Sequence, residues 1–346
     1  MAVGEPHLGH TPRLWLWLTV IFTGGGIVAA VALAPRASAP PLRGLAWLLF
    51  LGSSVHVAST GWLYTLADVR AYSAQRPLRY RWVPVGLVLG GAATAAIASP
   101  AQLSWLLLAY FAWQFFHFHR QNLGMAALAA SSHRVAPLTP TERGALTVAG
   151  GSGIVGLMAR PALIQLRVDT HIGFLFDAGE IVFAAAVLTG LVALGRRPAP
   201  DRPAGVGTVY AMALLFSLPV FVFSSPYAAV GGMTIAHGLQ YLLLVGLIAG
   251  GGRRTTRLRA VVVLGNIGLV GGALLSGASH LHDAMPVVRL LFGAYLGVVM
   301  AHFVIDAGLW RMRDPFPRMF LARHLPALVP PRADVVLGHG SAADIR

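Results

Sequence analysis

The segment Val299–Trp310 reads VMAHFVIDAGLW, and its two ionisable residues, His302 and Asp306, stand in an otherwise apolar run. Residues four apart lie on the same face of a helix, one turn above each other. An ionisable pair within a lipid-embedded helix is costly and almost always faces the interior of the helix bundle. The segment therefore predicts a transmembrane helix with one polar face, which polar side chains from other helices must meet.

The composition of the chain indicates a membrane protein. Of its 346 residues, 56% are hydrophobic and 11% are charged, whereas a soluble domain has about 25% charged residues. We therefore predict an all-α, polytopic transmembrane helix bundle. The bias toward arginine, alanine and glycine, with no lysine, is typical of a bacterial genome rich in GC. The expected location is thus the bacterial cytoplasmic (inner) membrane.

Apolar windows of about 20 residues, the length that crosses a bilayer, give about ten spans, with eight as the alternative count. The ten run over 14–33, 45–66, 82–98, 103–118, 145–158, 172–194, 209–223, 228–248, 261–275 and 287–310. Arginines gather after the even-numbered spans, so the positive-inside rule places both termini in the cytoplasm. We expect a single transmembrane domain over 1–326 and a mobile cytoplasmic tail over 327–346.

The charge balance is strongly basic, with a formal net charge of +14. Because the arginines lie between apolar segments, membrane orientation and anionic lipid headgroups explain them. The expected partner is therefore the lipid bilayer, and not nucleic acid; the sequence does not indicate an oligomeric state. With no cysteine in the chain, any metal site must use nitrogen and oxygen ligands.

His56 lies in the middle of the second span, in the run LGSSVHVAST. Ser53 and Thr60 stand three residues before and four residues after it, so both share its face of the helix. A hydrogen bond from one of these hydroxyls to the imidazole is therefore expected. The histidine belongs to a polar stripe on an otherwise apolar helix.

Two further spans carry similar stripes. In the fourth span His117 is followed one turn later by Gln121, and in the eighth span His237 is followed by Gln240 and Tyr241. The second, fourth, eighth and tenth spans all run in the same direction through the membrane. If they are neighbours, their imidazoles lie within a layer about one to two helical turns deep, each turn being roughly 5.4 Å.

His119 is assigned a different role from His117. Two residues along a helix correspond to a rotation of about 200°, so the two rings cannot easily hold one ion. We expect His117 to face the interior, and His119 to lie outside the ligand set. His119, Gln121 and Gln240 are then candidates for residues that orient the ligands.

Glu180 is the only glutamate well inside an apolar segment. An intramembrane carboxylate is a functional candidate by default. We therefore expect Glu180, together with Asp306 and Tyr241, to take part in catalysis by positioning or exchanging protons.

The four histidines predict a metal site. A polar residue that hydrogen-bonds a neighbouring helix stabilises the helix contact by about 0.6 kcal/mol. A single histidine within a span can therefore be explained without any ion. Four helices that each present a histidine beside another polar group favour a shared ion, since neutral imidazole is the commonest metal ligand. The expected ligands are His56, His117, His237 and His302, with Asp306 orienting His302 or completing the ligand set. Histidine and carboxylate with open positions suit Fe(2+), and zinc and manganese stay open.

Histidines dispersed over separate spans, the last within HFVID at 302–306, resemble those of the multi-histidine integral-membrane non-haem iron oxygenases. The nearest family is the Brp/Blh-type β-carotene dioxygenases. This resemblance implies a compact, all-helical protein that holds iron through the same four histidines and cleaves a lipid-dissolved polyene with dioxygen. The sequence departs from the pattern at Asp306, where the family would place a second histidine, so the substrate does not carry over.

The resulting hypothesis is a membrane-embedded, metal-dependent oxidoreductase or oxygenase that acts on an apolar small-molecule substrate from the bilayer. Three other functions stay open. A transporter or proton-coupled channel would use the intramembrane histidine, aspartate and glutamate as an ion pathway, although no inverted repeat is visible. Paired histidines on facing helices could bind haem. The basic loops would also suit a scaffold or assembly subunit.

Overall fold

Every regular element in the described part of the chain is a helix. The computed structural model describes residues 10–35, 41–251, 254–283 and 285–329, and the prediction of an all-α protein is confirmed there. The first elements are α1 (His10–Ala32), α2 (Arg43–Phe50), the π-helical turn η1 (Leu51–Val55), α3 (His56–Leu63), α4 (Ala67–Ala74), the π-helical turn η2 (Leu78–Trp82), α5 (Val83–Ile97), α6 (Pro100–Ser132) and α7 (Pro140–Ala159). They are followed by the 3-10 turn η3 (Pro161–Ile164), α8 (Phe174–Gly195), the 3-10 turn η4 (Ala199–Asp201), α9 (Ala204–Leu214), α10 (Leu218–Val222), the π-helical turn η5 (Tyr227–Gly231), α11 (Gly232–Gly250), α12 (Arg254–Ser279), α13 (Pro286–Leu309) and α14 (Pro315–His324).

Several of these helices suit a multi-pass membrane protein. Seven are long and apolar enough to cross a membrane: Pro12–Ala32, Arg43–Leu63, Leu78–Ile97, Phe174–Gly195, Tyr227–Gly250, Thr256–Ser279 and Pro286–Leu309. The other three predicted spans fall on α6, on α7 and on the pair α9 and α10. Leu89, Leu188 and Leu274 are examples of large apolar side chains that α5, α8 and α12 expose, as lipid-facing helices do. The count of ten spans and the position of the termini stay predictions.

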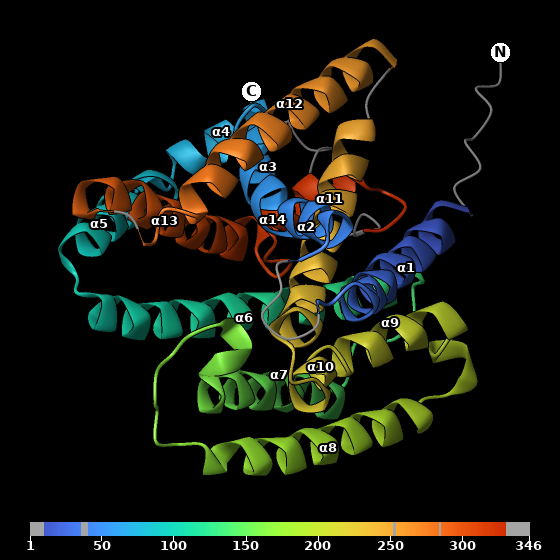
Figure 1. The fold of residues 1–346 in the computed structure, drawn as a ribbon. Helices are drawn as coiled ribbons and strands as arrows, with labels where there is room; N and C mark the ends of the chain where they lie inside the picture. Colours follow the sequence, from blue (N-terminus) through green and yellow to red (C-terminus); the bar gives the residue numbers. More distant parts are fainter. Residues whose placement is uncertain (1–9, 36–40, 252–253, 284, 330–346) are drawn as a thin grey trace.

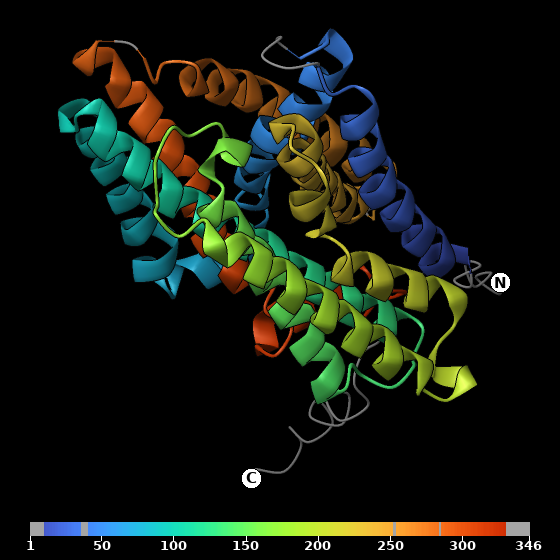
Figure 2. The same cartoon turned by 60° about the horizontal axis from the view of Figure 1, so that its bottom comes forward.

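Helix α11 lies at the centre of the arrangement and is the most enclosed of the seven. It contacts α1, α3, α6 and α12. Around it, α6, α7 and α8 run side by side along one edge of the molecule, and α5 lies along α13 (Figure 1, Figure 2). Of the other helices that carry predicted ligands, α3 and α6 contact this central helix, and α13 contacts both α3 and α6.

Glycines allow the closest of these helix contacts. A Cβ added to Gly52 in η1 would lie 2.5 Å from the Cα of Ile235 in α11, and one added to Gly238 would collide with the backbone of Gly52. Gly91 of α5 and Gly293 of α13 meet in the same way. Small residues let the backbones of membrane helices approach closely. The helix that carries His56 is thereby held directly against the helix that carries His237.

Local sequence signals set where the helices begin and end. At the start of α6, Ser99 Oγ accepts from the Gln102 backbone N–H at 3.3 Å, and the Gln102 side chain accepts from the Ser99 N–H at 2.9 Å. This capping box satisfies two N–H groups that the helix itself cannot use. The seventh predicted span is broken between α9 and α10, where Pro219 occupies the first turn of α10. Proline is tolerated in a first turn but not inside a helix, so the single span expected there becomes two short helices.

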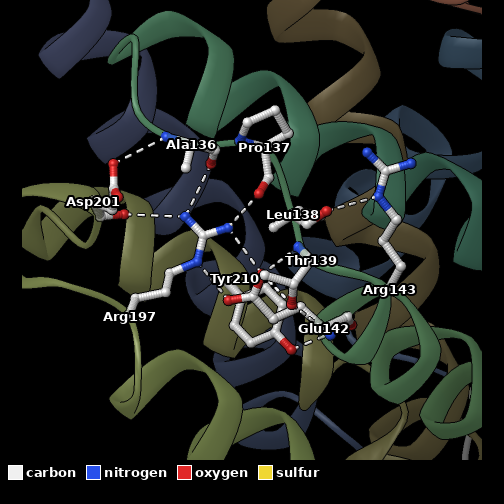
Figure 3. A network of polar contacts seen from close by, with 9 residues as sticks. All are labelled: Ala136, Pro137, Leu138, Thr139, Glu142, Arg143, Arg197, Asp201 and Tyr210. Atoms are coloured by element: carbon white, nitrogen blue, oxygen red, sulfur yellow. Dashed lines mark hydrogen bonds and ion pairs between the residues drawn. The ribbon is translucent and has the colours of Figure 1, made fainter.

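A buried ion pair joins the first turn of α7 to the turn after α8 (Figure 3). Arg197 donates from Nε to Glu142 Oε1 at 2.6 Å and from Nη2 to Oε2 at 2.8 Å. It also donates to the backbone carbonyl oxygens of Ala136, Pro137 and Asp201. Both charges are therefore paired and hydrogen-bonded, which is the condition under which buried charges are stable. The pair thus ties the turn after α8 to α7 and to the loop between α6 and α7.

The chain after α14 differs in part from the expected tail. Leu328 and Val329, which the sequence assigned to the tail at 327–346, are buried in the largest apolar cluster. They pack there with Leu321 and Leu325 of the preceding segment. The remainder of the predicted tail, from residue 330 onward, lies outside the described residues.

Candidate metal centre

Four imidazoles from four helices meet in the interior of the protein. His56 is the first residue of α3, and the others lie on α6 (His117), α11 (His237) and α13 (His302). The rings form a closed cycle of edge-to-face neighbours. The ring centroids lie 5.0 Å apart for His56 and His237, 4.9 Å for His237 and His117, 5.0 Å for His117 and His302, and 5.0 Å for His302 and His56. All four side chains are buried.

Two of the four histidines follow a π-helical turn. The turn η1 ends at Val55, directly before His56, and η5 directly precedes α11, which carries His237. A π-turn inserts one residue into the helical repeat and so changes the direction of every side chain after it, and such turns occur frequently at functional sites. In this protein the two turns shift the faces on which His56 and His237 lie relative to the residues that precede each turn.

The spacing of the ring nitrogens fits a metal ion. One ring nitrogen from each of His56, His237 and His302 lies within 4.8 Å of the other two. Single ligand atoms of His117, His302 and Asp306 form a second such group, which shares His302 with the first. Two nitrogens bound at about 2.1 Å to one ion are at most about 4.2 Å apart. Either group could therefore hold an ion after small side-chain movements.

The hydrogen bonding of the cluster is incomplete. Within the described residues, Nε2 of each of the four imidazoles is buried and lacks a hydrogen-bond partner, and so does Oδ2 of Asp306. A buried polar atom left unpaired costs about 1–3 kcal/mol. Five such atoms at one point need an explanation, and a bound ion is one that satisfies all of them together.

A chain of hydrogen bonds determines which nitrogen of His302 is available. Tyr241 donates its hydroxyl hydrogen to Asp306 Oδ1 at 3.4 Å, and the Tyr241 hydroxyl lies 2.8 Å from Thr60 Oγ1. Thr60 Oγ1 in turn lies 2.7 Å from His302 Nδ1. With Asp306 ionised and Tyr241 donating to it, the single hydrogen of each hydroxyl leaves Thr60 to donate to Tyr241 and to accept from Nδ1–H of His302. The proton of neutral His302 then resides on Nδ1, and Nε2, 3.6 Å from Asp306 Oδ2, is left with its lone pair for an ion.

Thr60 was expected to serve a different histidine. The sequence placed it on the face of His56, in its own helix, whereas the structure places its hydroxyl against His302 of α13. Ser53, the other expected partner of His56, donates to the Leu49 carbonyl oxygen at 2.6 Å. Helical periodicity shows which residues share a face, but it does not show that a neighbouring helix is close enough to compete for them.

The two glutamines hold the helices around His237. Gln121 Nε2 donates to the His237 carbonyl oxygen and to Gln240 Oε1, both at 2.9 Å. Gln240 Nε2 donates to Thr23 Oγ1 at 2.8 Å, which ties α11 to α1. Neither glutamine hydrogen-bonds an imidazole nitrogen within the described residues. Their contacts fix the position of the His237 backbone, and a role in orienting the ligand stays a prediction.

Two predicted site residues lie away from the four imidazoles. His119 packs against α7, where a Cβ on Gly150 would collide with its ring. Glu180 is exposed on α8 and does not line the cavity beside the cluster. Sequence reasoning selected Glu180 because its span is apolar all round, and an apolar helix gives no sign of which side faces lipid.

A cavity of about 360 Å³ lies next to the cluster. His117, Asp306 and Tyr241 line it together with aromatic side chains that include Trp113 and Phe303. A volume of this order is typical of a site for a small organic ligand. The candidate centre thus adjoins a space that is largely apolar.

Comparisons with known proteins identify no relative. No protein-family model, curated protein or solved structure matches the chain. The likeness to Brp/Blh-type dioxygenases therefore stays a resemblance in scattered histidines. The contacts of the four imidazoles and of the cavity beside them carry the functional proposal.

Proposed function

We propose that this protein is a membrane metalloprotein in which His56, His117, His237 and His302 bind a transition metal, and that it acts as a non-haem iron oxidoreductase or oxygenase. The observation that carries the proposal is the set of four buried, unpartnered Nε2 atoms in one cycle of rings. Four imidazoles gathered only for packing would leave these atoms unsatisfied in an apolar interior. A metal ion replaces the missing hydrogen bonds with coordination bonds.

The ligand chemistry favours iron. The cluster offers imidazole nitrogens and one carboxylate, in a chain without cysteine. Non-haem Fe(II) with open positions prefers such histidine and carboxylate ligands, while zinc binds a similar set. When bound, ferrous iron supplies the redox chemistry that dioxygen activation requires. A haem fits less well, because each of the four rings already contacts two others at 4.9–5.0 Å and leaves no gap of porphyrin width.

The residues of the cavity wall are suited to bind and orient a lipid-soluble substrate. Trp113, Phe303 and their apolar neighbours would exclude water and hold a hydrocarbon chain. Tyr241 and Asp306 line the same cavity, and the Tyr241 hydroxyl is hydrogen-bonded to both Thr60 and Asp306. Tyr241 can therefore pass a proton at its hydroxyl oxygen to or from Asp306. Exposed Glu180 is given no role in this proposal.

Metal analysis of the purified protein tests the proposal. The wild-type protein, produced with added iron, is expected to retain stoichiometric iron, and to consume dioxygen when a bacterial lipid extract is added. The variants His237→Ala and His302→Ala should lose both properties. His282→Ala, in an exposed turn, is the matched control and should retain both. Stoichiometric metal that persists in His237→Ala and His302→Ala would overturn the assignment.

A further inference from the structure

The cavity beside the four histidines has a basic wall in addition to its apolar one. Arg79 of η2, Arg120 of α6 and Arg311, which follows α13, all line it. Among its lining residues the only acid is Asp306. Arginines after membrane spans are expected from the positive-inside rule, but that rule does not require three of them to border one cavity.

The hydrogen-bonding capacity of these arginines is mostly unused within the described chain. Arg79 donates from Nε to the Val304 carbonyl oxygen at 3.3 Å, and this bond leaves its two terminal amino groups unpaired there. Arg311 lies 3.8 Å from Asp314 in a half-exposed pair. Arg120, one turn after His117, makes no hydrogen bond or ion pair with any described residue. A guanidinium has five N–H donors in a fork that matches oxyanions, so donors remain for a ligand.

The rest of the wall suits a hydrocarbon chain. Phe116, Met125, Leu128, Leu244 and Leu321 contribute apolar surface to the cavity. A wholly apolar ligand would fit these side chains but would leave Arg79 and Arg120 without a counter-charge. A small anion would fit the arginines but would leave the apolar wall in contact with water. A ligand that has both parts satisfies both walls.

We propose that the cavity binds an amphiphile with an oxyanion head and a long hydrocarbon chain, such as a long-chain carboxylate. Arg79 and Arg120 bind the head, and the chain lies along the apolar wall that reaches His117. As the substrate of the reaction, this ligand rests on the proposed function, but its binding requires no metal. The sequence predicts an apolar substrate, and this ligand adds an acidic head to that apolar chain. An oxyanion could come from a free acid or from the phosphate of a bilayer lipid, since both present the same chemistry to arginine.

A competition experiment distinguishes recognition of the ligand's anionic head from nonspecific partition of its hydrocarbon chain into the apolar cavity. The full-length protein in phosphatidylcholine nanodiscs is titrated with radiolabelled hexadecanoate at pH 9, and the label is displaced with unlabelled hexadecanoate or hexadecanol. The acid should displace the label at a concentration about tenfold lower than the alcohol, because a charge-assisted hydrogen bond is worth about that factor. Equal potency of the acid and the alcohol would overturn the proposal.

Arginine variants locate the head. Arg79→Gln and Arg120→Gln should each weaken hexadecanoate binding about tenfold and leave hexadecanol binding unchanged. Arg313→Gln is the matched control, since Arg313 lies in the same segment as Arg311 but is exposed and does not line the cavity. If Arg313→Gln weakened acid binding as much as Arg120→Gln, the effect would be a general surface attraction and the proposal would fail.

Two further measurements complete the test. Nanodiscs with added phosphatidylglycerol show the source of the anion: loss of hexadecanoate binding assigns the site to a bilayer phospholipid, and unchanged binding assigns it to a free acid. Both outcomes support an oxyanion site. Metal content is measured in the same preparations. A protein that selects the acid but holds no metal contradicts only the proposed function, and one that holds metal without selecting the acid contradicts only this inference.

Discussion

The hydroxyl of Thr60 lies 2.7 Å from Nδ1 of His302, 242 positions later in the chain. Thr60 belongs to the helix of His56, so this contact couples one ligand-bearing helix to another. With Tyr241 donating to ionised Asp306, Thr60 accepts from Nδ1–H and so selects the tautomer of His302 that leaves Nε2 available. Metal-ligating histidines commonly have such an orienting partner, and its loss typically lowers metal affinity about 10- to 100-fold.

Thr60→Val should therefore weaken metal binding by about that factor, although valine has nearly the same shape as threonine. Thr60→Ser retains the hydroxyl and should restore most of the affinity. Ser59→Ala, on the same helix, is the control, since Ser59 donates only to the Val55 carbonyl oxygen. Competition with a chelator of known affinity measures the change. Equal metal affinities for Thr60→Val and the wild-type protein would show that the contact does not orient the ligand.

The close contact between η1 and α11 gives a second prediction. Gly238→Ala would push a methyl group into the backbone of Gly52 and separate the helices of His56 and His237. We expect a loss of stability of about 1–3 kcal/mol, as for overpacking in a core, together with weaker metal binding. Gly246→Ala lies on the same helix, where a Cβ would meet no atom within 4 Å. It should be neutral or stabilise by up to about 1 kcal/mol through helix propensity. Thermal unfolding in detergent compares the two variants.

The sequence predicts the site in so far as the site follows from periodicity. His56, His117, His237 and His302 each share a helical face with other polar residues, and four such faces in apolar spans imply a common interior. The contacts between helices are beyond this reasoning. The bond from Thr60 to His302 depends on how closely α3 and α13 approach, and the arginines on the cavity wall come from three separate segments that only the fold brings together. The π-turns before His56 and α11 have no signal in composition at all.

Glu180 and Glu142 also show that the sequence does not reveal which carboxylates are buried. Glu180 attracted a functional prediction because it stands in an apolar run, but it lies exposed on α8. Glu142 stands before a predicted span, and no role was predicted for it. It is nevertheless fully buried and paired with Arg197. The sequence does give the reason for its helix start, since Thr139 and Glu142 form a capping box. It does not show that Arg197, 55 residues later, completes the ion pair.

The pair of Glu142 and Arg197 predicts a pH-dependent stability. Burial raises the pKa of Glu142, but hydrogen bonds from Arg197 and Thr139 outweigh it and hold the pKa below its usual value. The group therefore stabilises the fold above its unfolded pKa of about 4.3, and this contribution is lost as the pH falls through the lower folded pKa. Unfolding measured between pH 7 and pH 3 should show this loss in the wild-type protein.

Glu142→Gln should flatten that part of the pH profile. It should also destabilise the protein at pH 7 by about 3–5 kcal/mol, since it leaves the buried guanidinium of Arg197 without a counter-charge. Asp177→Asn is the control, because Asp177 is mostly exposed and only 4.0 Å from Arg160 at the limit of an ion pair. A profile in Glu142→Gln that matches the wild-type profile would assign the acid sensitivity to other carboxyl groups.

The four unpartnered Nε2 atoms predict opposite effects of one substitution with and without metal. His237 is fully buried, and both of its ring nitrogens lack a hydrogen-bond partner among the described residues. Replacing such a group with an apolar side chain of similar size is often neutral or stabilising. His237→Leu should therefore unfold at the same temperature as the chelator-treated wild-type protein, or at a higher one. With metal present the order should invert, since an ion at 100 times its Kd stabilises the wild-type protein by about 2.7 kcal/mol and stabilises the variant, which lacks one ligand, by less. A histidine kept only for packing would give one order under both conditions, so thermal unfolding of both proteins, with chelator and with iron, decides between the two roles.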